Sequence, residues 1–314
     1  MKKQNVGGQA VIEGVMMQSK HYRAIAVRKS NGEIELKKER ISSWVNDKKI
    51  DKIPFLRGGF VLFETMIQGM KSLNYSSEFF MEEDDEEDAI DRFLKNVFKD
   101  KANDVIMAIS LVLAMIFSVG LFVLIPTTIS GLFSKIIKNN IVLNLIEGLI
   151  RIGILILYML AISKNKDIKR TFMYHGAEHK CINCVEHGLP LTVENVLASS
   201  RQHKRCGTSF LFLVMLISIF LHFIFVLIPF YWARLFGRLL MVPIVAGISF
   251  EIIQWAGRSD SKLADFFSKP GLAMQKLTTK EPTADMAEVA IKAVEAVFDW
   301  RAYLKEEFGV EVES

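Results

Sequence analysis

Four stretches of the chain are long and apolar enough to cross a lipid bilayer as helices, and no other feature constrains its fold as strongly. A bilayer core requires about 20 mostly apolar residues in a helix. The four stretches are residues 105–129, 141–162, 209–230 and 239–257. Because the connections within the first pair and within the last pair are short, we expect two antiparallel helix hairpins. The sequence therefore predicts a mainly α-helical membrane protein with four transmembrane helices.

The distribution of lysine and arginine predicts how these helices are oriented. Basic residues are in excess in the loops on the cytoplasmic side of a membrane. Segment 164–207, between the two hairpins, carries eight of them, whereas each hairpin turn carries two. We therefore expect a multi-pass protein of the inner or plasma membrane in which this segment and both termini are cytoplasmic. We expect no signal peptide, because Gly7-Gly8 stands where an apolar segment would be needed.

Changes in composition divide the chain into six segments. The cytoplasmic parts are an N-terminal α+β region with a β-hairpin and an amphipathic helix, an acidic linker with a pre-membrane helix, a segment rich in histidine and cysteine, and a C-terminal amphipathic helix. The two transmembrane hairpins alternate with them. In chain order the segments are residues 1–81, 82–104, 105–163, 164–207, 208–257 and 258–314.

The N-terminal region combines strands with a helix. Asn31-Gly32 is the strongest signal for a two-residue turn, and it predicts a β-hairpin over residues 24–40. A single hairpin is marginally stable, so we expect residues 9–15 to add one more strand. Residues 60–80 are apolar but carry polar side chains at helical spacing, which predicts an amphipathic helix.

Side chains of the kind that bind metals are concentrated in residues 175–206. This short segment contains four of the six histidines and all three cysteines. His175 and His179 would share one face of a helix and could hold one metal ion, with Glu178 beside them. The same H-x-x-E-H order occurs in inverted zinc metallohydrolases. The segment predicts a site for zinc or another divalent transition metal, with Glu178 as the general base that takes a proton from metal-bound water.

The remaining ligands should come from a second helix, predicted over residues 193–204. We expect His203 to join His175 and His179 as a ligand, with Cys206 as a fourth. Three protein ligands and one open position are typical of catalytic zinc, whereas four closed ligands are typical of structural zinc. Secondary candidates are the competing thiols Cys181 and Cys184, the acids Glu251, Glu194 and Glu13, and the basic residues Arg201 and Arg205.

Four sequence motifs, spread over the whole chain, together resemble one known family. They run from Gly7 to Met17, from His175 to Lys180, from Arg201 to Thr208 and from Pro270 to Pro282. The combination resembles the YqhQ-like family of bacterial membrane proteins, a domain of unknown function described as predicted metal-dependent enzymes. The resemblance implies a metal-dependent activity but no particular substrate.

These features lead us to expect a metal-dependent hydrolase that acts at the cytoplasmic membrane surface on a membrane-associated substrate. A net charge of +4 and the lack of a basic tract with interleaved aromatic residues argue against nucleic acid as a partner. One alternative is an ion transporter in which Glu147, Arg151 and Glu251 line the path. The other is a non-enzymatic assembly factor with a structural metal site. The sequence is compatible with a homo-oligomer and does not indicate one.

Overall fold

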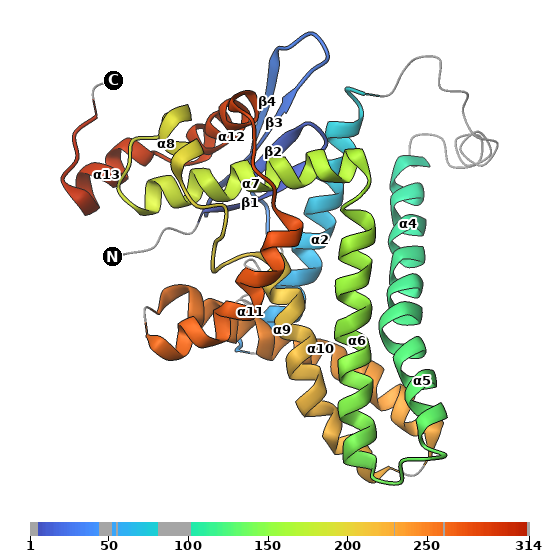
Figure 1. Cartoon of the computed structure of the whole chain (residues 1–314). Helices are drawn as coiled ribbons and strands as arrows, with labels where there is room; N and C mark the ends of the chain where they lie inside the picture. Colours follow the sequence, from blue (N-terminus) through green and yellow to red (C-terminus); the bar gives the residue numbers. More distant parts are fainter. Residues whose placement is uncertain are drawn as a thin grey trace. The chain divides into compact units, whose positions relative to one another are not determined.

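The chain folds mainly into helices, with one small antiparallel sheet near its N-terminus (Figure 1). Its contacts divide it into two units, the first of residues 1–80, 159–217 and 239–314 and the second of residues 81–158 and 218–238. The computed structural model describes residues 6–43, 52–54, 56–80, 102–228, 230–259 and 261–312. The predicted acidic linker at residues 82–88 lies outside these ranges.

Within the described chain, four helical segments are long and apolar enough to cross a membrane, as the sequence predicts. They span Val105–Phe133, Asn140–Ile162, Gly207–Phe225 and Leu235–Arg258. The helices that form them are α4 (Ala102–Val119), α5 (Ile125–Phe133), α6 (Asn140–Ile162), α9 (Gly207–Leu221) and α10 (Tyr231–Arg258). A π-helical turn, Gly120–Leu124, joins α4 to α5 just before Pro126. A proline lacks the backbone N–H that a continuous helix would require, so the change of helix type occurs where the sequence demands it.

The first unit contains a four-stranded antiparallel sheet whose strands follow one another in chain order. Its strands are β1 (Gly7–Val11), β2 (Gly14–Gln18), β3 (Tyr22–Arg28) and β4 (Ile34–Arg40). Most residues of β2 and β3 are buried, whereas no residue of the edge strand β4 is buried. The lysines of β4 protect this edge from pairing with another chain.

Two details of the sheet differ from the prediction. Residues 9–15 do not form one strand, because β1 and β2 are joined by a tight turn in which Glu13 has a positive φ of 48°. The β3–β4 hairpin has a three-residue loop, because the Lys29 N–H donates to the Glu33 carbonyl. Gly32, with φ of 87°, closes that loop in the left-handed conformation. The predicted two-residue turn is therefore wrong by one residue.

Helices cover both faces of this sheet. Helices α7 (Lys166–Glu186) and α12 (Ala284–Val297) pack together on one face and form the main core with β2 and β3 (Figure 1). Helix α2 (Leu56–Ser77), which matches the predicted amphipathic helix, leads to aromatic residues on the other face. That second cluster contains Val11, Met16, Ile25 and Val27 of the sheet, with Tyr75, Phe79 and Phe80 against them.

The C-terminal region contains three helices where the periodicity predicts one. They are α11 (Lys262–Thr278), α12 and α13 (Trp300–Phe308). Helix α12 buries its apolar stripe, which consists of Met286, Val289, Ala290, Ala293, Val294 and Val297. The segment between α11 and α12 crosses α7, where the Lys280 N–H donates to the Phe172 carbonyl. This crossing brings the C-terminal region against the helix that carries the H-x-x-E-H residues.

Candidate metal centre

Helix α7 provides the frame of the candidate site. It begins after Asn165, whose side-chain oxygen caps the first turn by accepting two backbone hydrogen bonds. It ends at Glu186, and Gly188, two residues further on, has a left-handed φ of 76°. The spacing of four residues places His175 and His179 on one face, with ring centroids 4.4 Å apart.

Three side chains converge at this face: His175, His179 and Cys206. One nitrogen or sulfur atom of each lies within 4.8 Å of the other two. The Cys206 Sγ is 3.4 Å from the His175 Nε2. Zinc binds imidazole nitrogen at about 2.1 Å and thiolate sulfur at about 2.3 Å, so two ligands of one tetrahedral ion lie roughly 3.3–3.8 Å apart. The three residues are therefore a suitable donor set for a single divalent ion.

Hydrogen bonds to backbone carbonyls fix the tautomer of both histidines. The Nδ1 of His175 lies 2.9 Å from the Thr278 oxygen, and the Nδ1 of His179 lies 2.7 Å from the Arg201 oxygen. A carbonyl oxygen only accepts, so Nδ1 carries a proton in each ring, and Nε2 is the nitrogen that has the lone pair in the neutral form. Metal-binding histidines are commonly held in this way. Both rings are thus arranged as metal ligands.

Glu178 lies beside the two histidines. Its Oε2 is 3.9 Å from the Nε2 of His175 and 3.6 Å from the Nε2 of His179. The side chain is only 5% exposed, so the carboxylate is held close to the ligands and away from bulk water. This position suits a proton acceptor next to a bound ion.

The three side chains perturb one another electrostatically. Burial alone would lower the pKa of His179, but the carboxylate of Glu178 and the thiol of Cys206 raise it to about 9. Burial alone would raise the pKa of Cys206, yet hydrogen bonds with His175 and His179 hold it well below its usual range. Burial also opposes protonation of His175, and the contact with Cys206 outweighs it and raises the pKa. The cluster therefore holds two histidines that favour the cationic form next to a cysteine that favours the thiolate, in a largely buried position.

The segment that carries Cys206 is less regular than predicted. Helix α8 spans Val193–Ala198, and Thr192 caps it by accepting from the Asn195 N–H. The predicted helix over residues 193–204 is thus too long, because residues 199–206 are irregular, with bends and no helical turn. An extended segment can turn its carbonyl groups toward α7, which a helix could not do because its carbonyls bond within the helix.

Two polar side chains of α7 anchor this segment. The Nζ of Lys180 donates to the carbonyls of Leu197 and Ser199, at 2.7 and 2.8 Å. The amide of Asn183 donates to the carbonyls of Ser200 and Gln202, at 2.6 and 3.0 Å. These bonds hold the Arg201 carbonyl against His179. Lys180 and Asn183 were not predicted as site residues, although their spacing of three places them on one helix face.

Gly176 permits the close approach of the C-terminal segment. A Cβ atom at this position would lie 2.0 Å from the Lys280 carbonyl oxygen. Two residues before Lys280, Thr278 supplies the carbonyl that binds His175. The small residue inside the His175–His179 run is therefore required by backbone packing.

His203 lies near the cluster but does not join it. Its Nε2–H donates to the Glu186 carboxylate at 3.1 Å, and its Nδ1 accepts from the Arg205 N–H at 3.4 Å. Both ring nitrogens are thus engaged, and the ring centroid is 5.9 Å from that of His179. Gln275, which is fully buried, binds the His203 backbone on both sides. The structure places Cys206, not His203, as the third donor beside the pair on α7.

Cys181 and Cys184 face away from the cluster. Both thiols are buried in the main core, against α12 and the sheet. Burial raises the pKa of Cys184 to about 11 and raises that of Cys181 well above its usual range. A thiol held neutral in an apolar core packs as a small hydrophobic side chain.

The other predicted site residues are distributed around the first unit. Glu13 accepts hydrogen bonds from Arg170 and from the Tyr174 hydroxyl. Glu251 is bound by the Nε and Nη2 atoms of Arg57, each at 2.6 Å. The other three have separate positions: Glu194 in the first turn of α8, Arg201 against Glu281, and Arg205 against Glu186.

The second unit contains a buried ion cluster of its own. Glu147 accepts from Arg151 at 3.0 Å and from Arg238 at 2.5 and 2.7 Å. The Thr127 hydroxyl also donates to this carboxylate. Arg151 further donates to Ser218 and His222. Arg238 is a member of this cluster that the sequence did not single out.

Comparison with known proteins gives a family without an assigned activity. A family model described as "Protein of unknown function (DUF1385)" matches residues 53–300. The "Uncharacterized protein YqhQ" of Bacillus subtilis (strain 168) is 38% identical over 292 residues, which cover 91% of this chain and 90% of that protein. No solved structure matches the chain.

Proposed function

We propose that this chain, which belongs to the DUF1385 family of proteins of unknown function, is a metal-dependent enzyme of the cell membrane. Its family membership confirms the resemblance that the sequence motifs indicate. The proposal rests on one observation: His175 and His179 each donate Nδ1–H to a carbonyl, so each presents Nε2, the metal-binding nitrogen of the neutral ring, beside the Cys206 thiol. Histidines that only stabilise a fold do not require Nδ1 bound to a carbonyl and Nε2 next to other metal-binding atoms.

The number of donors favours a catalytic site over a structural one. His175, His179 and Cys206 would leave one position of a tetrahedral ion open, whereas structural zinc is usually closed by four protein ligands. His203 is engaged by Glu186 and cannot close the site without breaking that pair. The open position would be next to the Glu178 carboxylate.

The reaction class that fits these residues best is hydrolysis. A divalent ion held by the three donors would supply Lewis acidity toward water and substrate. Glu178 would accept the proton of the attacking water and return it to the leaving group. The Thr278 and Arg201 carbonyls would keep both imidazoles in the ligand tautomer throughout.

We further propose that the four membrane helices form two hairpins and that the metal centre faces the cytoplasm. The excess of lysine and arginine in segment 164–207 supports this orientation. A reducing compartment also suits three free cysteines, which the structure keeps unpaired. The substrate would then be reached at the inner surface of the membrane.

Metal analysis of the purified full-length protein tests the site. The expected result is about one transition-metal ion per chain. His179→Ala should remove most of it, whereas His187→Ala should not, because His187 is exposed at the end of the same helix. Cys206→Ser should also lose metal, and Cys184→Ser should keep it. Equal metal content in all four variants would remove the basis of the proposal.

Glu178→Gln tests catalysis separately from metal binding. The amide keeps the size of the side chain and removes its basicity, so metal content and thermal stability should be retained. Complementation of the deletion phenotype in a bacterium that carries this gene should be lost. Full complementation by Glu178→Gln together with failure of His179→Ala would point to the assembly factor with a structural metal.

The transporter alternative depends on the buried cluster of the second unit. Glu147 is already engaged by two arginines and a threonine, a pattern that suits an internal ion pair. Glu251, the third residue of that hypothesis, is bound to Arg57. Ion flux in proteoliposomes that is abolished by Glu147→Gln and unaffected by Glu178→Gln would favour transport over hydrolysis.

A further inference from the structure

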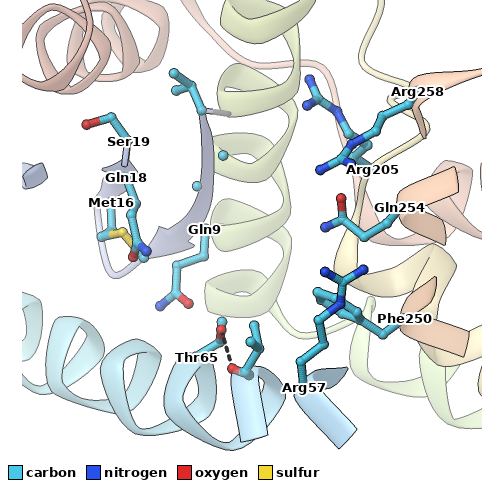
Figure 2. Close-up of a pocket in the computed structure, with 14 residues that line it drawn as sticks. Gln9, Met16, Gln18, Ser19, Arg57, Thr65, Arg205, Phe250, Gln254 and Arg258 are labelled. Carbon is cyan, nitrogen blue, oxygen red and sulfur yellow. Dashed lines mark hydrogen bonds between the residues drawn. The ribbon is translucent and has the colours of Figure 1, made fainter. Parts of the chain in front are cut away.

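A pocket of about 530 Å³ lies in the first unit. Strands β1 and β2 form one wall, and helices α2 and α10, with the loop before α9, form the rest (Figure 2). Pockets for small organic ligands commonly measure about 300–1,000 Å³. The pocket is therefore large enough for a substrate and much larger than an ion requires.

Arginine dominates the charge of this pocket. Arg57, Arg205 and Arg258 line it, and Figure 2 shows them along one wall. The described lining residues include no carboxylate. Glu251 pairs with Arg57 and Glu186 pairs with Arg205, so two of the three charges have a counter-ion just outside the lining. Within the described chain, the exposed Arg258 forms no ion pair, and the pocket keeps a surplus positive charge.

The other lining residues provide neutral polar groups and an apolar part. Three glutamines supply amides: Gln9, Gln18 and Gln254. Gln9 and Gln18 lie opposite the arginines in Figure 2. Met16 and Phe250 supply apolar surface. An anionic group with an uncharged organic remainder matches this combination.

Phosphate is the anionic group that these residues fit best. A guanidinium binds two phosphate oxygens with a pair of parallel N–H donors, and several arginines can share one phosphate. The guanidinium of Arg258 could engage both oxygens of a carboxylate, whereas a phosphate has further oxygens for the glutamine amides. The neutral glutamines add donors without a repelling charge.

The pocket shares a wall with the candidate metal centre. Gly8 lines the pocket, and a Cβ atom there would lie 3.0 Å from the Glu178 Cγ. Arg205 lines the pocket and directly precedes Cys206. We propose that this pocket holds the phosphate of a phosphorylated substrate and presents the adjoining part of the molecule to Glu178. The assignment of the bound compound as a substrate rests on the proposed function, whereas phosphate binding does not.

The phosphate could belong to a lipid headgroup or to a soluble compound. Helix α10 is a candidate membrane span that ends at Arg258, and an arginine at such an end lies at the headgroup level. Phe250, Gln254 and Arg258 are in its last turns. A lipid phosphate would therefore reach the pocket directly, and a soluble phosphate ester would reach it from the water side.

Binding measurements on full-length protein in detergent test the proposal. The probes are phosphatidic acid against phosphatidylcholine for the lipid source, and glycerol phosphate and inorganic phosphate for the soluble source. Arg258→Gln should weaken binding of the accepted probe about tenfold, because one charged donor is lost. Arg40→Gln, at an exposed arginine of β4, is the control for general surface charge and should have little effect. Both measurements are made with metal-loaded and chelator-treated protein.

Each outcome decides the proposal. Preference for phosphatidic acid that depends on Arg258 identifies the lipid source, and Arg258-dependent binding of the soluble probes identifies the other source. Binding that Arg258→Gln and Arg40→Gln weaken equally, or no binding of any probe, overturns the proposal. If the purified protein binds phosphate but binds no metal, the proposed function is refuted and the phosphate pocket still stands.

Discussion

At the scale of single residues, the site depends on how closely backbones approach α7. Gly176 leaves room for the Lys280 carbonyl, with which a side chain at this position would collide. A Cβ atom at Gly8 would lie 2.5 Å from the Met16 carbonyl oxygen and 3.0 Å from the Glu178 Cγ. These two glycines let two other segments of the chain reach the histidine-bearing helix. Neither contributes a functional group, yet the positions of the ligands depend on both.

Gly176→Ala should destabilise the protein. The added methyl group would collide with the Lys280 carbonyl, and displacing backbone in a packed region costs about 1–3 kcal/mol. The Thr278 carbonyl would move with it, so metal content should fall as well. Thermal unfolding and metal analysis measure both effects. Gly153→Ala is the matched control, since no described heavy atom lies within 4 Å of its Cβ and alanine favours helix by about 1 kcal/mol. Wild-type stability in Gly176→Ala would show that the crossing segment adjusts freely.

At the scale of elements, the early end of α8 has a functional consequence. The chain after Ala198 is no longer helical, so its carbonyls are free to bind side chains of α7. Lys180 and Asn183 bind three of these carbonyls, those of Ser199, Ser200 and Gln202, and His179 binds that of Arg201 between them. The metal centre is thus supported by hydrogen bonds between a helix and a loop.

Asn183→Ala should lower metal affinity without removing a ligand. The Ser200 and Gln202 carbonyls would lose their partner, and the loop that holds His179 would loosen. Loss of such supporting residues commonly costs 10–100-fold in metal affinity. Titration against a competing chelator measures the effect. Asn195→Ala is the control, because its amide binds Pro190 at the other end of α8. Equal metal affinities in the two variants would show that these hydrogen bonds to the loop do not support metal binding.

At the scale of the whole molecule, the distribution of basic residues favours the orientation in the membrane that we propose. The positive charge of segment 164–207 would be on the cytoplasmic side together with both termini. The hairpin turns, with few basic residues, would be outside. This arrangement places the three free cysteines in a reducing compartment.

Reporter fusions test this topology directly. Fusions after Ser163 and after Ser314 should report a cytoplasmic location, and a fusion after Asn139 should report the outside. A fusion pair of opposite activity, such as alkaline phosphatase and a fluorescent protein, gives a positive signal on each side. An external signal after Ser163 would overturn the orientation and the expected access of substrate from the cytoplasm.

Features that depend on local pattern could be predicted from the sequence alone. Apolar length gave the four spans, and helical spacing gave the pairing of His175 with His179. The clustering of ligand-type residues pointed to Cys206 as well as to His203. Periodicity is a property of neighbouring residues, so these features can be read without knowledge of the fold.

Which of the remaining groups lie together depends on the packing of distant segments. Cys206 lies beside the histidine pair and His203 does not, because Glu186 and the Arg205 N–H engage both nitrogens of His203. The carbonyls of Thr278 and Arg201 come from segments far along the chain. Arg57, Arg205 and Arg258 share a pocket although the chain separates them widely. Contacts between distant segments follow from packing, and no local pattern encodes them.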